Sequence, residues 1–133
     1  MKIKTSELIG PALNWAVGEI EFNRLISEGE YVKQWVLDSH KAGRHTEPYS
    51  SDWMWGGPII DRLLAQGAEI RQGSSSAGNQ RCWFKLDSQI LYSRGENVLI
   101  AAMRCRVASR LGDVIDIPDE LGITSTTPNS NTL

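Results

Sequence analysis

Residues 49–58 (YSSDWMWGGP) hold the densest set of side chains in this chain that could bind a ligand. Their aromatic rings offer flat faces on which a nucleic-acid base or a sugar can stack. The polar groups of Ser51 and Asp52 could hydrogen-bond ribose hydroxyls. Free N–H groups at a helix start, with Gly57 allowing close approach, could receive a phosphate or a carboxylate. A purely structural interpretation competes with this one: Asp52 caps a helix, Trp53 fills the core and the glycines form a turn.

Arg104 is the second candidate, because a helical projection places it among small apolar neighbours. A guanidinium is rarely buried without a partner, and its planar fork fits a carboxylate or a phosphate. We therefore expect either an anion contact in a pocket or an internal salt bridge. Arg106 and Arg110 fall on another side of the same helix, which predicts a solvated face. The acids available for an internal salt bridge include Asp52, Asp61 and Glu19.

Signals for metal binding or catalysis are weak. His40 and His45 are the only histidines and, with Glu47, supply three ligands where a zinc site usually needs four. No glycine-rich phosphate fingerprint is present. Cys82 and Cys105 fit small core residues better than a disulfide. We therefore expect no metal, no cofactor and no catalytic residues, and an enzyme acting on a nucleotide is the weakest of the functional alternatives.

Three helices are expected to position these residues. Apolar spacing predicts a first helix with Thr5 or Ser6 as a cap at its entry. Because Pro11 cannot donate an N–H, either a short first turn precedes it or the regular helix begins near Pro11 and runs to about Phe22. Glu19 and Glu21 fall outside its apolar stripe. The Gly-Gly-Pro sequence at 56–58 predicts a break, with a regular helix only from Pro58 to the region of Gly67. The third predicted helix covers residues 96–111 and ends at Gly112.

Short strands are expected between and after these helices. Val and aromatic residues predict a strand within residues 31–37. Residues 68–71 and 82–86 predict a hairpin around the flexible loop 73–79, and residues 114–118 a short extended piece. The fold class that follows is α+β: a small sandwich in which a short antiparallel sheet is covered by helices. One domain is expected over residues 1–122, with a disordered polar tail at 123–133.

Length, charge and tryptophan content bound the function. The 133 residues carry 14 Lys+Arg and 16 Asp+Glu, a formal charge of −2. This charge predicts no overall electrostatic attraction to extended nucleic acid or to an anionic membrane. No apolar run approaches a membrane span or a signal peptide, so a cytoplasmic location is expected. Of the five tryptophans, Trp15 and Trp83 are expected in the core, and Trp53 could serve either role. Packing explains Trp35 and Trp55 least, which leaves them available for recognition.

Several blocks of sequence occur in an order that resembles the NinX-like proteins of temperate phages. The resemblance covers most of residues 1–121, and its blocks are residues 1–8, 12–17, 49–53, 56–60 and 99–109. It implies an α-β-α sandwich and a phage accessory protein in the cytoplasm of an infected bacterium, without an assured activity. Asn14 stands where the family usually has Asp, and Met54-Trp55 where it has Ala-Gln. A catalytic carboxylate at position 14 is therefore not expected.

Our leading functional hypothesis is non-catalytic binding of a small anionic, nucleotide-type ligand, which would sequester a host defence signal. The protein is expected to be a homo-oligomer. The first alternative is a protein-binding module that inhibits or redirects a host factor through exposed tryptophans. The predicted ligand-binding residues are Asn14, Tyr49, Ser51, Asp52, Trp53, Gly57 and Arg104.

Overall fold

The computed structural model describes residues 1–44, 46–71, 80–86, 89–95 and 97–121, with only the backbone described in 70–71, 80–86 and 89–94. Several features of the sequence analysis therefore lie outside the described part: the predicted loop 73–79, the tail 123–133, His45, Glu96 and the side chains of Cys82 and Trp83. The helices are α1 (Gly10–Ser27), α2 (Gln34–Lys41), α3 (Trp53–Ala65) and α4 (Val98–Leu111). The strands are β1 (Lys2–Lys4), β2 (Glu69–Arg71), β3 (Gln80–Leu86), β4 (Gln89–Gly95) and β5 (Val114–Asp116).

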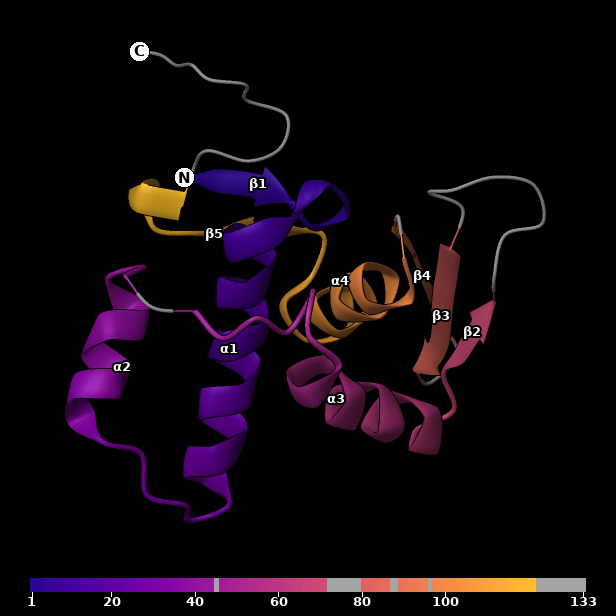
Figure 1. Ribbon diagram of the computed structural model, residues 1–133. Coiled ribbons are helices and arrows are strands. Elements are labelled where there is room, and N and C mark those ends of the chain that lie inside the picture. The colour runs from indigo at the N-terminus through magenta and orange to yellow at the C-terminus, as the bar shows by residue number, and fades with distance from the viewer. Residues whose placement is uncertain (45, 72–79, 87–88, 96, 122–133) are drawn as a thin grey trace.

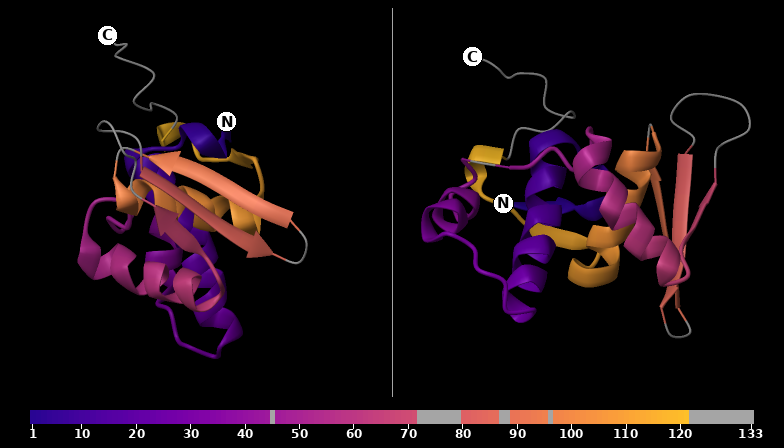
Figure 2. Two further views of the ribbon diagram at one scale, coloured as in Figure 1. Left: turned by 90° about the vertical axis from the view of Figure 1, so that its right-hand side faces the viewer. Right: turned by 60° about the horizontal axis from the view of Figure 1, so that its bottom comes forward.

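The described strands form two antiparallel sheets (Figure 1). One has the order β2-β3-β4, and α4 packs across its β3 and β4 strands, with α3 next to α4 (Figure 2). The other pairs β1 with β5, so that Ile3 lies opposite Ile115 and strands from the two ends of the described chain meet. This arrangement confirms a small α+β sandwich.

The hydrophobic core lies around α1 and α4. Leu13 and Val17 of α1 and Met103 and Val107 of α4 are fully buried, because the two helices pack against each other. One continuous cluster of buried apolar residues runs along the chain from Leu8 to Leu121. The core predictions for Trp15 and Cys105 are confirmed, since both side chains are buried in this cluster.

The start of α1 differs from the expected cap. Thr5 lies in a short 3₁₀ turn (Thr5–Glu7), and the residue before α1 is Ile9, whose side chain makes no capping hydrogen bond. Pro11 falls in the first turn of α1, where its missing N–H costs nothing. The Thr5 hydroxyl instead donates to the carbonyl of Gly112, 2.6 Å away. The hydroxyl that the local pattern assigned to a helix cap therefore makes a tertiary hydrogen bond instead.

The strand predicted within residues 31–37 is wrong, because the chain forms α2 there. His40 is buried against α1: its ring stacks on Trp15 with centroids 5.2 Å apart, and its Nε2 lies 2.9 Å from Oε2 of Glu19. The indole N–H of Trp15 donates to the His40 carbonyl at 2.6 Å. The hydrogen bond with His40, opposed in part by burial, lowers the pKa of Glu19. These contacts with α1 stabilise a helix that the local propensities did not predict.

The break predicted at residues 56–57 is also wrong, since α3 passes through both glycines and Pro58. The predicted cap is confirmed: the Asp52 carboxylate accepts a hydrogen bond from the N–H of Met54 at 2.9 Å. Gly56 is buried at a close approach, where a side chain would meet the carbonyl of Tyr49 and one methyl group of Leu99. Here glycine serves packing between elements rather than a turn.

The remaining elements follow the sequence more closely. The β2–β3 hairpin, the extended piece at β5 and the end of α4 before Gly112, whose φ is +92°, are confirmed. Strands β1 and β4 were not predicted. β4 pairs with β3 along its whole length, from Gln80 opposite Gly95 to Leu86 opposite Gln89.

Candidate anion-binding site

The predicted ligand-binding residues do not form one site. Tyr49 lines a cavity between α1 and α3 together with Trp55. Ser51 and Trp53 line another, against the start of α4. Arg104 lines a third, beneath β1. The structure therefore divides the dense segment 49–58 between two cavities and separates it from Arg104.

Asn14 holds the segment that leads into α3. Its side chain is buried in α1, and its Oδ1 accepts hydrogen bonds from the N–H of Ser50 at 2.9 Å and from the Ser50 hydroxyl at 2.7 Å. Burying an amide oxygen is tolerated because both bonds satisfy it. Asn14 thus positions the neighbouring Tyr49 and is absent from the lining of the α1–α3 cavity.

Asp52, Trp53 and Gly57 have distinct places at the start of α3. The Asp52 carboxylate is engaged as the cap. Trp53 is 58% exposed, so the interpretation of Trp53 as a core residue is wrong. Gly57 is partly buried, and the nearest atom to a side chain added there would be a ring carbon of Trp53 at 3.8 Å. Of these three residues, Trp53 is the one that presents an apolar face to a neighbouring molecule.

The α1–α3 cavity has a volume of about 260 Å³ and combines aromatic and charged walls. The rings of Tyr49 and Trp55 meet edge to face at 5.9 Å. Burial, and then the nearby carboxylates of Glu21 and Glu47, raise the pKa of the Tyr49 phenol, so it stays a neutral hydroxyl. The lining residues are Glu21, Arg24, Leu25, Tyr49, Met54, Trp55, Pro58, Ile59 and Arg62.

Three arginines surround one buried carboxylate beside this cavity. The Glu21 side chain is 7% exposed. Its Oε1 accepts from Nη2 of Arg62 at 2.6 Å and from Nε of Arg24 at 3.2 Å, and its Oε2 lies 3.6 Å from Nη2 of Arg106. Arg106 comes from α4 and its side chain is 4% exposed, so the prediction of a solvated Arg106 is wrong. We call these four residues the Glu21 cluster.

The Glu21 cluster carries more positive than negative charge. Arg24 also pairs with Glu28 at 3.0 Å, so three arginines face two carboxylates, a local sum of +1. Within the described part of the chain, Oε2 of Glu21 and the buried Nε atoms of Arg62 and Arg106 have no hydrogen-bond partner. Burial, and then repulsion from Arg110 and Arg62, lower the pKa of Arg106, although Glu21 opposes the shift. The fold therefore places three guanidinium groups close enough together to attract an added anion.

Sequence reasoning missed the Glu21 cluster. Its members come from α1, α3 and α4, and local spacing joins only Glu21 to Arg24, three positions apart in α1. One signal was available: residues 12–18 of α1 are apolar or small on nearly every side, which is typical of a helix buried all round. A charged residue in the following turn of such a helix requires partners from other elements.

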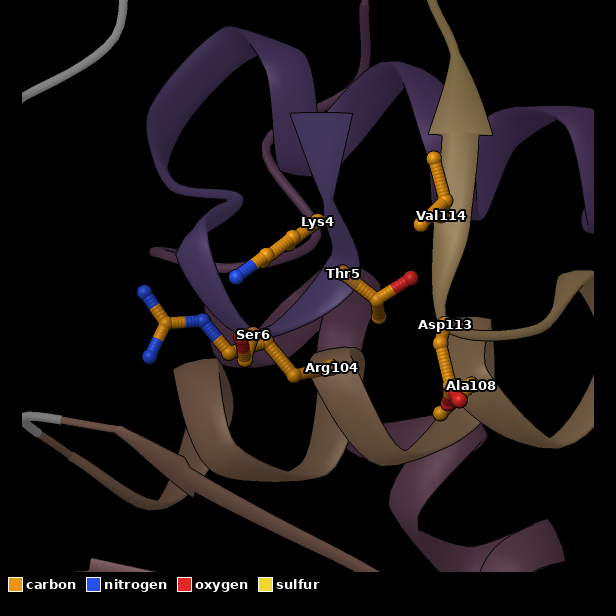
Figure 3. A pocket seen from close by; sticks show the side chains of 7 residues that line it. All are labelled: Lys4, Thr5, Ser6, Arg104, Ala108, Asp113 and Val114. Atoms are coloured by element: carbon orange, nitrogen blue, oxygen red, sulfur yellow. The ribbon is translucent and has the colours of Figure 1, made fainter. Parts of the chain in front are cut away.

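Arg104 lies in the third cavity, of about 220 Å³ (Figure 3). Its Nε donates to the carbonyl of Leu8 at 2.8 Å. Lys4 and Ser6 line the same cavity, and none of its lining residues belongs to the α1–α3 cavity.

Comparison with known families gives a match across most of these elements. The family model described as bacteriophage P22 NinX matches residues 4–110. The chain belongs to the NinX family of phage proteins. The part matched to NinX contains α1 to α3, all of α4 except its last residue, and every member of the Glu21 cluster, whereas β5 lies beyond it. A comparison with curated proteins gave no match. No helix in the described part of this NinX-family chain is long and apolar enough to cross a membrane.

Proposed function

We propose that this NinX-family protein binds a small anionic, nucleotide-type ligand in the α1–α3 cavity without chemical turnover. The observation that carries the proposal is the Glu21 cluster beside Tyr49 and Trp55. A nucleotide combines a charged phosphate with a flat base, and the cavity wall offers guanidinium groups next to aromatic rings.

In this proposal the phosphate and the base of the ligand contact different parts of the cavity wall. Arg24 and Arg62 line the cavity and supply donors for the phosphate, with the neutral Tyr49 hydroxyl beside them. Trp55 and Met54 supply the apolar wall for the base. The volume of about 260 Å³ falls just below the roughly 300–1,000 Å³ usual for drug-sized ligands. A mononucleotide would therefore be partly enclosed, with the remainder over Met54, which is 78% exposed.

Membership of a phage protein family suggests a biological role for this binding. A phage accessory protein that acts in the cytoplasm of the infected bacterium can lower the free concentration of a host signal by binding it. Such sequestration requires affinity and abundance but no catalytic group. A host defence signal of nucleotide type would fit the charge and the aromatic wall of the α1–α3 cavity.

The test is calorimetric titration of the purified protein with linear and cyclic nucleotides. We expect saturable binding of at least one of them, weakened about tenfold or more by Arg24→Gln and by Trp55→Ala, because each removes a cavity wall group. Arg44→Gln and Trp35→Ala are matched controls, since both side chains are exposed and neither lines the cavity. We expect both controls to bind like wild type.

Two results would overturn the proposal: no nucleotide binds, or the control variants lose as much affinity as the cavity variants. Incubation of each bound nucleotide with the protein, followed by chromatography, tests turnover. Steady product formation that Asp52→Asn abolishes would favour the enzyme alternative. We expect the bound nucleotide to be recovered unchanged.

A protein partner is the second candidate function, favoured by the exposure of Trp35 at the start of α2, which is 64% exposed. Exposed tryptophans are enriched in binding hot spots. Affinity capture of a stoichiometric host factor by wild type, lost in Trp35→Ala but kept in Trp55→Ala, would support this function over ligand binding. Native mass spectrometry of the same sample tests the predicted homo-oligomer.

A further inference from the structure

The cavity beneath β1 lies apart from the α1–α3 cavity and has its own chemistry. It is formed where β1, the 3₁₀ turn after it, α4 and the start of β5 meet (Figure 3). Its volume of about 220 Å³ is small compared with pockets for drug-sized ligands. The lining residues are Lys4, Thr5, Ser6, Arg104, Ala108, Asp113 and Val114.

Two cationic side chains converge at one end of this cavity. Figure 3 shows the Lys4 ammonium and the Arg104 guanidinium pointing to the same side, with Ser6 beside the Arg104 side chain. The hydrogen bond from Arg104 Nε to the Leu8 carbonyl, 2.8 Å long, fixes the direction of the guanidinium. A half-buried arginine held in this way is an oriented donor group rather than a freely moving surface charge.

The charges at that end favour an anion. A cation that has no ion-pair partner is stabilised when an anion lies beside it. Lys4 makes no ion pair with any other residue that the structure describes. The one carboxylate in the cavity wall is Asp113, and Figure 3 shows it at the opposite end, next to Ala108.

From this convergence we infer that the cavity beneath β1 binds a phosphate-type oxyanion through Lys4, Ser6 and Arg104. The ammonium, the hydroxyl and the guanidinium lie at the same end of the cavity (Figure 3). A tetrahedral dianion can accept from all three at once, whereas a carboxylate is satisfied by one guanidinium. The small volume fits a single phosphate group. The site shares no residue with the α1–α3 cavity, so either proposal can fail without the other.

The test is titration with inorganic phosphate followed by two-dimensional NMR of the ¹⁵N-labelled protein. We expect saturable shifts of the Thr5 and Ser6 amide signals, with the Met54 amide unchanged. Lys4→Gln and Arg104→Gln should each raise the dissociation constant about tenfold or more, since each removes a charged donor. The matched controls are Lys2→Gln in the same strand and Arg110→Gln in the same helix, which remove equal charge outside the lining.

A second arm separates two sources of the anion. Tighter binding of ribose 5-phosphate than of inorganic phosphate indicates the phosphate group of a larger molecule, and equal binding indicates free phosphate; both support the site. The inference is wrong if potassium chloride at matched ionic strength gives the same shifts, or if Lys2→Gln weakens binding as much as Lys4→Gln. Lys4 is exposed, so Lys4→Gln keeps the test decisive even if Arg104→Gln unfolds.

Discussion

Glu21 is the residue on which the charge balance of the interior depends. Its carboxylate is nearly excluded from solvent and faces guanidinium groups from three helices, counting its own. Taking these ions out of water costs several kcal/mol for each, which only their mutual attraction and hydrogen bonds offset. Removing the carboxylate would leave the arginines to repel one another in a poorly solvated place.

We therefore expect Glu21→Gln to lower the free energy of unfolding by about 3 kcal/mol or more, the usual cost of breaking a buried ion pair. The matched control is Glu28→Gln, because Glu28 also pairs with Arg24 but its side chain is 54% exposed. An exposed pair contributes about 0.2–1 kcal/mol, so the control should lie within that range. Urea denaturation measures both, and equal losses would contradict a special role for Glu21.

At the same scale, the sequence predicted some residues and not others. Asp52 was predictable as a cap because capping depends on neighbours along the chain. The burial of Arg106 was not, since a helical projection shows which residues share a face but not which face meets the core. Trp53 was ambiguous for the same reason, and the packing of α3 left it exposed.

Helix α3 shows how contact between elements overrides a local break signal. Two adjacent glycines and a proline weaken a helix, and glycine costs roughly 0.8–1 kcal/mol relative to alanine. The helix continues because Gly56 lets it approach the Tyr49 carbonyl and Leu99 closely. Gly57, one residue on, has no such contact.

The two glycines should respond oppositely to alanine. Gly56→Ala forces its Cβ into the Tyr49 backbone, so we expect a loss of about 1–3 kcal/mol, typical of overpacking. Gly57→Ala meets only ordinary contact at 3.8 Å and should raise stability by about 0.5–1 kcal/mol. Thermal unfolding followed by circular dichroism measures both changes. A stabilised Gly56→Ala variant would show that close approach does not explain the continuous helix.

Across the whole molecule, the two ends of the described chain are joined beside the core. The Thr5 N–H donates to the Asp113 carbonyl at 2.7 Å, and its buried hydroxyl donates to Gly112, 107 positions away in sequence. These bonds lie where β1 meets β5. They hold the floor of the cavity beneath β1, which includes Thr5 and Asp113.

Thr5→Val should therefore lower the free energy of unfolding by about 1–3 kcal/mol, because it leaves the Gly112 carbonyl without its donor. Ser6→Ala removes the neighbouring hydroxyl, which is exposed, and should change stability by no more than about 0.5 kcal/mol. Guanidinium titration of both variants provides the comparison. If the two variants are equally stable, the contact between the chain ends does not contribute as inferred.

The sequence by itself determined the features that depend on neighbours along the chain: the α+β class, the presence of α1, the course of α4, the Asp52 cap, the β2–β3 hairpin and the NinX family. Helix α1 runs to Ser27, beyond the predicted end at about Phe22. Only the tertiary structure decided that residues 34–41 form α2, that α3 is continuous, and that the predicted site residues divide among separate cavities. The Glu21 cluster belongs to the second group. Arg62 of α3 and Arg106 of α4 meet Glu21 of α1 only when these helices pack, since the attraction between charges depends on distance in space.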